Sequence, residues 1–391
     1  VSIDIALEQT VLERELTITA PSPTVDTEST KIASVIDEDM LKNIPLARNL
    51  NDIVNIVPGA VSEGAAKTFS AVHGSTVRGN TYAFDGVNMN DPAVMSPLTN
   101  INFDVMEEIE IETAGHPASV GVTDGAYINV VTKSGGNRFS GGAILYYTDE
   151  GMNDMLWTTE QVKALGVAQP AVDKSWGDLS LTFGGPLLKD RLWFFTNGRY
   201  IRREQKTNFI PFTDILGRSH GTYDWTREET MGFAKLTSQV NSRLKMMMMM
   251  NHVGIYQPMY DQPGPRTPFI STMVWDHEKT YTLNGLANYI LDQNTFAEIR
   301  VGYVRRFFAI PMQKEAQDLP WVDDAGDLYG PLTGARYNAQ YVRKRTQALA
   351  SITRFQDNWL GASHEFKGGV EFEDAYFDYD RSDIREDARA V

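Results

Sequence analysis

The chain has 391 residues, of which 42% are hydrophobic and 22% charged, so its composition is that of a folded protein and not of a disordered tail. Its net charge of −15 and the lack of any block rich in lysine and arginine exclude a nucleic-acid partner, because contact with phosphates needs a basic face. Cysteine is absent, which excludes disulfide bonds and cysteine metal sites. No apolar run of about 18 residues occurs, so the sequence predicts no membrane-spanning helix.

The first part of the chain, residues 1–138, combines short predicted strands and helices with glycine-rich turns. It opens on the alternating stretch VSIDIALEQT without an initiating Met, and we expect the natural N-terminus to lie further upstream. DEDMLKNI (37–44) has the acidic start of a helix, and ARNLNDIVNIVPG (47–59) spaces its apolar residues at helical intervals. Three predicted strands follow, at 81–87, 107–114 and 126–137.

The glycine-rich segment TFSAVHGSTVRGNTYAFDGVNMNDP (68–92) is not typical of a phosphate-binding loop. A P-loop needs a lysine after its last glycine, and a dinucleotide-binding turn needs G-x-G-x-x-G, whereas Gly74 and Gly79 are too far apart and no lysine follows them. The step Asp85-Gly86 instead predicts a hairpin turn. Taken alone, the segment is consistent with a pair of β-turns that pack a small domain.

The second part, residues 139–391, has the pattern of β-strands throughout. In DLSLTFG, for example, Leu179, Leu181 and Phe183 fall on one face, and Ser180 and Thr182 on the other. FAEIRVGY (296–303) and HEFKGGVEFED (364–374) alternate in the same way. Nine strands are predicted, near 141–148, 175–184, 191–203, 229–240, 243–255, 279–291, 295–309, 344–356 and 364–377.

The connections between these predicted strands alternate in length. The short ones are 184–190, 241–243, 292–295 and 356–363, and the long ones are 149–174, 204–228, 256–278 and 310–343. Short turns at one end and long loops at the other are typical of an outer-membrane barrel whose strands alternate apolar-out and polar-in. Alternating strands also occur in soluble antiparallel sheets, so a soluble all-β carbohydrate-binding protein is an alternative.

An odd number of strands does not close a bacterial barrel, and an open sheet edge cannot face lipid. We therefore expect the chain to stop before the end of its barrel, in a loop after DAYFDYDRSD. The run KMMMMMN (245–251) shows no preference for one face. Several tryptophans lie near strand ends and predict either an aromatic girdle or core aromatics: Trp157, Trp176, Trp193, Trp225 and Trp275.

Three segments resemble the plug domain of TonB-dependent outer-membrane receptors, most of all the Oar-like branch. They are IPLARNLNDIVNIVPGAV, VHGSTVRGNTYAFDGVNMNDP and MEEIEIETAGHPASVGVTDGAYINVVTKSGGNRFSGG, and the resemblance covers roughly residues 10–150. YAFDGV matches the family step Tyr-x-x-Asp-Gly-Val at Tyr82, Asp85, Gly86 and Val87. The resemblance implies an α+β plug followed by the first strands of a transmembrane antiparallel barrel of about 22 strands.

By this resemblance the glycine-rich segment supplies the apex of the plug, where ligand is captured. Family members carry Arg-Gly where this chain has His73-Gly74, and Arg78-Gly79 comes five residues later, so the position of the plug arginine stays open. His73 is otherwise expected to be an exposed loop residue. The apex and ligand candidates are His73, Gly74, Arg78, Gly79, Asn80, Tyr82, Asp85, Gly86, Asn88 and Asp91.

A segment before the plug resembles the box through which such receptors couple to TonB. An added strand needs an extended, unpaired, β-prone run, and ELTITA followed by Pro21 and Pro23 provides one. The box candidates are Glu15, Leu16, Thr17, Ile18, Thr19 and Ala20. The alternative is that residues 1–20 are the last strand of a preceding β domain.

The resemblance implies four regions. Residues 1–9 end a preceding carboxypeptidase-regulatory-like β domain, 10–24 form the coupling box and linker, 25–138 the plug, and 139–391 a partial barrel. The sequence carries no H-E-x-x-H or G-x-S-x-G motif and no spaced acid–base pair, so we expect no enzyme activity, no cofactor and no metal site.

The expected function is energised uptake of an unidentified ligand through a plugged barrel in the outer membrane of a Gram-negative-type bacterium. The implied partners are the periplasmic domain of TonB with its inner-membrane motor proteins, outer-membrane lipid and the ligand. An outer-membrane adhesion or scaffold protein of the same fold that does not transport is the alternative, because fold does not fix function.

Overall fold

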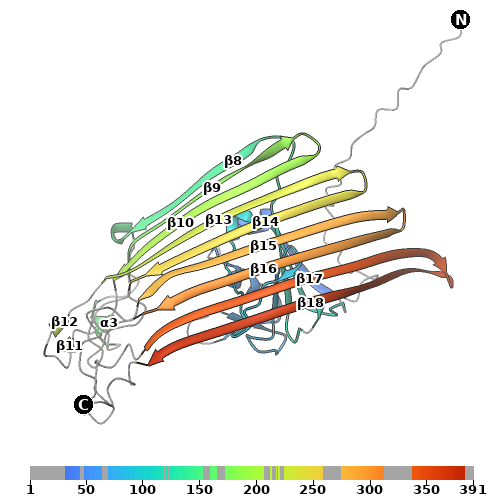
Figure 1. The fold of residues 1–391 in the computed structure, drawn as a ribbon. Helices are drawn as coiled ribbons and strands as arrows, with labels where there is room; N and C mark the ends of the chain where they lie inside the picture. Colours follow the sequence, from blue (N-terminus) through green and yellow to red (C-terminus); the bar gives the residue numbers. More distant parts are fainter. Residues whose placement is uncertain are drawn as a thin grey trace, which may run out of the picture.

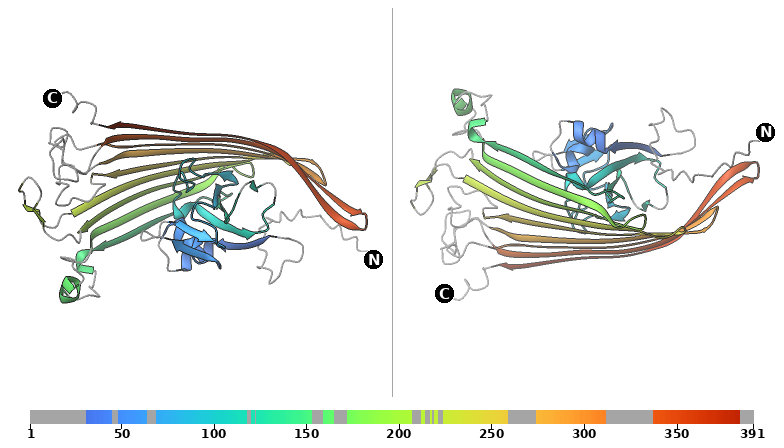
Figure 2. Two further views of the ribbon diagram at one scale, coloured as in Figure 1. Left: turned by 90° about the horizontal axis from the view of Figure 1, so that it is seen from below. Right: turned by 90° about the horizontal axis from the view of Figure 1, so that it is seen from above.

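The computed structural model consists of a small α+β domain that lies against one face of a large curved sheet (Figure 1). Figure 2 shows that the domain occupies the concave side of this sheet. The structure describes residues 31–44, 48–63, 69–117, 120–121, 123–152, 159–164, 172–206, 212–213, 217, 219–220, 224–258, 274–311 and 337–383. The predicted coupling box, residues 15–20, and the predicted preceding domain, residues 1–9, lie outside the described residues.

The large sheet is an antiparallel meander of nine strands, each paired with its neighbours in the chain. Its strands are β8 (Ser140–Asp149), β9 (Val172–Leu188), β10 (Leu192–Lys206), β13 (Asp224–Asn241), β14 (Leu244–Gln257), β15 (Trp275–Asp292), β16 (Thr295–Ile310), β17 (Tyr337–Trp359) and β18 (Ala362–Asp383). All nine predicted strands are confirmed, and each is longer than predicted. The sheet is open, because β8 and β18 each have one neighbour.

Short and long connections alternate as predicted. The turns after β9, β13, β15 and β17 contain two or three residues each, and the other connections are long. At the short-turn end the β17–β18 hairpin extends beyond the neighbouring strands (Figure 2). Strand pairing explains this extension, because β16 begins opposite Arg354, whereas the β17–β18 ladder continues to the pair Trp359–Ala362.

The two faces of the sheet separate apolar from polar side chains. Leu179, Leu181 and Phe183 are exposed on the convex face, whereas Ser180 is buried on the concave face toward the small domain. The run of methionines follows the same alternation: Met246, Met248 and Met250 are exposed, and Met247 and Met249 are buried. The expectation that this run has no preferred face is therefore wrong, because a regular strand assigns alternate residues to opposite faces whatever their identity.

The small domain contains a five-stranded sheet in the order β1-β6-β7-β4-β5. Its strands are β1 (Ile32–Asp37), β4 (Thr81–Phe84), β5 (Val87–Asn88), β6 (Met106–Ala114) and β7 (Tyr127–Thr132), with β4 and β7 parallel. A separate hairpin joins β2 (Ala60–Glu63) to β3 (Phe69–Val72). The buried residues of this sheet, such as Phe84, Ile109 and Ile128, form one core with Met249 and Phe233 of the large sheet.

Two short helices cover the small sheet. Helix α1 (Glu38–Asn43) is capped by Asp37, whose Oδ1 accepts a hydrogen bond from the Met40 amide at 2.8 Å. Helix α2 (Leu50–Val54) is capped in the same way by Asn49. The helical spacing over 47–59 predicted a longer helix, but α2 ends at Val54, and the amides of Ile56 and Val57 bond to carbonyls three residues back.

The other described elements are short. They are η1 (Phe103–Val105) before β6, η3 (Glu150–Met152) and α3 (Thr159–Ala164) after β8, and the strand pair β11 (Phe212–Thr213) and β12 (Ser219–His220). Among the helices of the described segments, none is long and apolar enough to cross a membrane.

Candidate functional site: the plug–wall interface and its cavity

The loop that follows β4 anchors the small domain, called the plug below, to the concave face of the nine-stranded sheet, called the wall. Asp85 and Gly86 form the predicted tight turn, with φ values of 48° and 77°. The Asp85 carboxylate accepts hydrogen bonds from the amide and hydroxyl of Thr132 at 3.0 and 2.6 Å. Lys235 of β13 lies 3.3 Å from the same carboxylate and also donates to the Thr132 carbonyl at 2.7 Å. Since both charged side chains are 6% exposed, the pair is a buried link between plug and wall.

Two glycines allow the chain to approach the wall closely at this loop. A Cβ on Gly86 would lie 2.2 Å from Nη1 of Arg300, which donates to the Gly86 carbonyl at 3.2 Å. A Cβ on Gly302 would lie 2.1 Å from Cγ1 of Val87. The absence of side chains at both positions therefore sets how closely β5 lies against β16.

Strand β17 holds the segment that follows β5. Oε1 of Gln347 accepts a hydrogen bond from the Asn88 amide at 2.8 Å, and Nε of Arg345 donates to the Asn90 carbonyl at 2.9 Å. Arg343 forms a buried ion pair with Asp91, which is fully buried. Three consecutive inward side chains of one strand thus bind three positions of the same plug loop.

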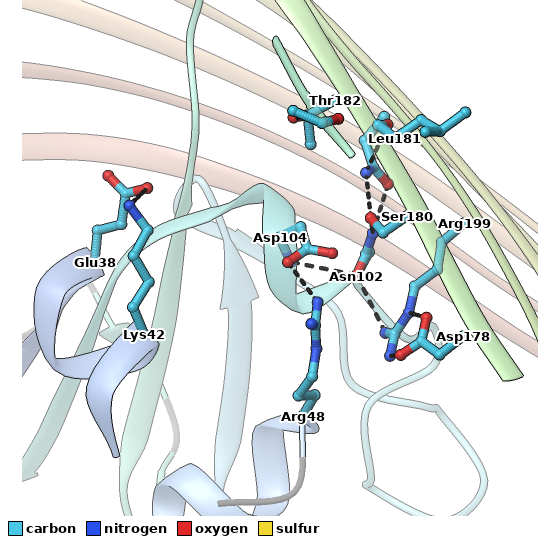
Figure 3. A network of polar contacts seen from close by, with 12 residues as sticks. Glu38, Lys42, Arg48, Asn102, Asp104, Asp178, Ser180, Leu181, Thr182 and Arg199 are labelled. Carbon is cyan, nitrogen blue, oxygen red and sulfur yellow. Dashed lines mark hydrogen bonds and ion pairs between the residues drawn. The ribbon is translucent and has the colours of Figure 1, made fainter. Parts of the chain in front are cut away.

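Asn102 makes a second anchor, on β9 and β10 (Figure 3). Its Nδ2 donates to Oδ1 of Asn197 at 2.6 Å, and its Oδ1 accepts from Nη1 of Arg199 at 3.1 Å. Arg199 is held by Asp178 through two hydrogen bonds of 2.7 and 2.5 Å. Asn102 is fully buried, so this network fixes the chain just before η1 and β6.

The predicted apex candidates fall into three groups: exposed residues, residues buried inside the plug and residues that contact the wall. His73, Gly74 and Arg78 are exposed, whereas Asn80 and Tyr82 are buried inside the plug. The carbonyl of Gly79 accepts hydrogen bonds from the amides of residues 124 and 125. The remaining candidates, Asp85, Gly86, Asn88 and Asp91, are those that contact the wall. Whether any of them contacts a ligand stays a prediction.

A cavity of about 330 Å³ lies between the plug and the wall. The plug contributes the N-terminal end of α2 with the two residues before it, from Arg48 to Asn51, and the loop around Asn100. The wall contributes inward residues of β9, β10 and β13, among them Trp176, Arg203 and Trp225. These wall residues lie close to the strand ends that lead into the long connections.

Every arginine of this cavity has a carboxylate partner. Arg48 is paired with Asp104, and Arg199 with Asp178. Nε of Arg203 lies 2.7 Å from Asp173, and Nε of Arg227 lies 2.6 Å from Glu229. Two of the arginines also lie over aromatic rings, Arg48 over Tyr146 and Arg203 over Trp225.

A polar cluster lies where the start of β1 meets the end of the neighbouring strand β6. Nζ of Lys31 lies 2.5 Å from Oε1 of Glu112, and Nδ1 of His116 lies 3.5 Å from Oε2 of the same carboxylate. Burial and the charge of Glu112 raise the pKa of the neighbouring Glu110, although Lys31 at 3.8 Å opposes this shift. This cluster includes Lys31, the first described residue of the plug.

The wall side of this interface could not be identified from the sequence. Lys235, Arg343 and Asn197 lie in segments with no motif of their own, and only strand parity shows that they point inward. The girdle interpretation is wrong for Trp176 and Trp225, because both line the cavity on the concave face. Trp193 donates to Asn137 at 2.7 Å, and the side chains of Trp157 and Trp275 lie outside the described residues.

Comparison with known proteins agrees with this architecture. Residues 26–126 match the family model of the TonB-dependent Receptor Plug Domain. The chain is 28% identical over 206 residues to the TonB-dependent transporter Oar of Myxococcus xanthus, an alignment that covers 50% of this chain and 19% of Oar. The chain thus aligns with about a fifth of the length of this relative.

Solved structures share the fold at low sequence identity. The siderophore receptor PirA of Acinetobacter baumannii matches with a TM-score of 0.63 and 13% identity, over 88% of this chain and 48% of PirA. The alcaligin receptor FauA of Bordetella pertussis matches with 0.62 and 12%, over 91% and 49%. The outer-membrane transporter YddB of Escherichia coli matches with 0.57 and 13%, over 90% and 54%.

The fold is that of an outer-membrane plugged barrel, with a plug domain against the inner face of an antiparallel wall. Within that class, residues 26–126 match the plug domain of TonB-dependent receptors, the nine-stranded sheet has the fold of their barrel wall, and the sequence is similar to that of the TonB-dependent transporter Oar. Proteins of this kind reside in the outer membrane of Gram-negative bacteria, which places this chain there.

Proposed function

We propose that the protein takes up a ligand across the outer membrane in a TonB-dependent manner. The observation that carries this proposal is the docked plug, which fills the concave side of the wall through buried polar contacts from Asp85, Asp91 and Asn102. These hydrogen bonds and ion pairs can be exchanged for water when the plug moves, although the plug also shares an apolar core with Met249 and Phe233 of the wall. A plugged lumen then needs an energy source to open, and that source is TonB with its motor proteins.

In this proposal each region of the chain has its own role. Residues 10–24 are the coupling box and linker, 25–138 the plug, and 139–391 the wall. The exposed apolar side chains of the convex face, such as Leu181 and Val370, contact lipid. The cavity between plug and wall receives part of the ligand from the side of the long connections, and the exposed residues His73, Gly74 and Arg78 are further candidates for contact with it.

Capture by the periplasmic domain of TonB tests the coupling step without knowledge of the ligand. The bait is the detergent-purified full-length protein, and the test variant is Ile18→Pro, which removes a hydrogen-bond donor from the added strand. The matched control is Ser22→Pro, which introduces the same residue between two prolines of the linker.

We expect capture of the wild type and of Ser22→Pro, and at least a tenfold loss with Ile18→Pro. Capture of all three would support TonB coupling but would show that the box lies outside residues 15–20. If TonB captures none of them although the plug remains folded, the proposed energised uptake is wrong.

A further inference from the structure

The cavity at the plug–wall interface combines two indole rings with arginines whose charges are already balanced. Resting on the proposed uptake function, we propose that this cavity binds a neutral, polyhydroxylated unit of the transported ligand, such as a sugar ring of a glycan. The argument depends on the charges, the aromatic surface and the size of the cavity.

The first step concerns charge. Four arginines line the cavity, and each has its own carboxylate: Asp104 for Arg48, Asp178 for Arg199, Asp173 for Arg203 and Glu229 for Arg227. The four pairs carry no net charge. Only Glu229 among these carboxylates lines the cavity itself, but the other three lie within ion-pair distance of its arginines and offset their charge, so little attraction remains for an anionic ligand.

The second step concerns hydrogen bonding. Guanidinium groups held by carboxylates keep further N–H donors, and the carboxylates keep further lone pairs. Arg203 bonds to Asp173 through Nε, and 41% of its side chain is exposed, so donors and acceptors lie side by side at the wall. Hydroxyl groups, which both donate and accept, match such a surface without needing a free charge.

The third step concerns the aromatic surface. Trp176 and Trp225 are half-buried and line the cavity on either side of Arg203. Trp176 pairs with Arg203 across the β9–β10 ladder. On the other side, the Arg203 guanidinium lies 6.0 Å from the ring centre of Trp225. Tyr146 extends this surface and lies 6.2 Å from Trp176 in a stacked arrangement. Indole rings offer flat apolar area beside polar groups, which suits a ring with C–H faces and a hydroxyl-bearing edge.

The fourth step concerns size. A cavity of about 330 Å³ is at the lower limit of ligand sites, which span roughly 300–1,000 Å³. It therefore accommodates one or two rings, and the remainder of a larger ligand would lie beyond it.

Calorimetry and tryptophan fluorescence on the detergent-purified full-length protein test this proposal. The probes are five neutral trisaccharides (maltotriose, cellotriose, xylotriose, mannotriose and triacetylchitotriose), citrate as the anion and trialanine as the peptide. The variants are Trp225→Ala and Trp176→Ala, with Trp193→Phe as the control, because Trp193 lies at the short-turn end of β10.

We expect at least one trisaccharide to bind with an affinity that does not change between 50 and about 500 mM salt, because no net charge is involved. Trp225→Ala and Trp176→Ala should each weaken this binding at least about tenfold, and Trp193→Phe should not. In Asp173→Asn, which leaves Arg203 without its carboxylate, citrate should begin to bind and its affinity should fall with salt.

Salt-sensitive binding of citrate by the wild type, binding of trialanine in preference to every trisaccharide, or no binding of any trisaccharide by a protein whose plug is folded would each overturn the proposal. None of these measurements involves TonB. A failure here therefore leaves the uptake proposal standing, and a failure of TonB capture leaves the ligand chemistry open to this test.

Discussion

Lys235 of the wall and Asp85 of the plug form a buried ion pair at 3.3 Å, although they are 150 positions apart in the chain. The same lysine bonds to Thr132, whose hydroxyl and amide bond to Asp85, so three groups close one network across the interface. A buried pair of this kind adds little when intact, but removal of one partner leaves a buried charge uncompensated. The pair therefore determines the docking position of the plug and adds little to the free energy of folding.

Lys235→Met removes the charge and keeps an unbranched side chain that is one atom shorter. We expect it to destabilise the docked plug by about 3–5 kcal/mol, because Asp85 then stays buried without a cation. Hydrogen exchange of the plug amides in the detergent-purified protein measures this loss. Lys245→Met, at an exposed position of the adjacent strand β14, is the control and should leave exchange unchanged.

The contact between Val87 and Gly302 can be fixed covalently. A Cβ on Gly302 would lie 3.3 Å from Cβ of Val87, close to the spacing of a disulfide, and the chain contains no other cysteine. In Val87→Cys/Gly302→Cys we expect a cross-link on oxidation that stabilises the docked plug by about 2–4 kcal/mol.

Mass spectrometry of the linked peptides detects this bond, and denaturant titration with and without reductant measures the gain. Val87→Cys alone should respond to neither oxidant nor reductant. If the double variant does not cross-link under oxidising conditions, β5 does not lie against β16 as described here.

Met248 and Met249 are adjacent in the chain but lie on opposite faces of β14. Met249 is fully buried in the core shared by plug and wall, whereas Met248 is 57% exposed on the convex face. We expect Met249→Ala to cost about 2–5 kcal/mol of unfolding free energy, and Met248→Ala less than about 1 kcal/mol. Equal losses in denaturant titration would contradict the strand register.

Glu110 and Glu38 are expected to affect the plug in opposite directions with pH. Burial, with the charge of Glu112, raises the pKa of Glu110 above 4.5, so its ionised form opposes folding at pH 7 and this cost disappears as pH falls toward 4.5. Burial acts to raise the pKa of Glu38, but hydrogen bonds from Lys42 and Lys133 hold this pKa below 4.5. The ionised Glu38 therefore stabilises the folded plug above pH 4.5, and this stabilisation is lost as the pH falls through the lowered pKa.

Glu110→Gln should therefore stabilise the plug at pH 7, by less than about 1 kcal/mol because a third of the side chain is exposed, and the gain should vanish near pH 4.5. Glu38→Gln should destabilise it at pH 7 and have no effect at the lowest pH. Denaturant titrations at a series of pH values measure both, and the same sign for both variants would refute the assignment.

The sequence by itself determined the elements that depend on local patterns. The alternation of Leu179, Ser180 and Leu181 predicted the faces of β9, because side chains of a strand point to opposite sides at every step. The step Asp85-Gly86 predicted its turn, because few residues other than glycine, asparagine and aspartate adopt a positive φ. The alternation of short and long connections predicted the meander.

Only the tertiary structure decided which residues meet across the interface. The ion pairs Asp85–Lys235 and Asp91–Arg343 join residues 150 and 252 positions apart, and no local pattern encodes such a pairing. The same is true of Trp176 and Trp225, whose places near strand ends agree equally well with a lipid girdle and with an inner cavity. Their side depends on strand register and on where the plug docks, which are set by the packing of the whole chain.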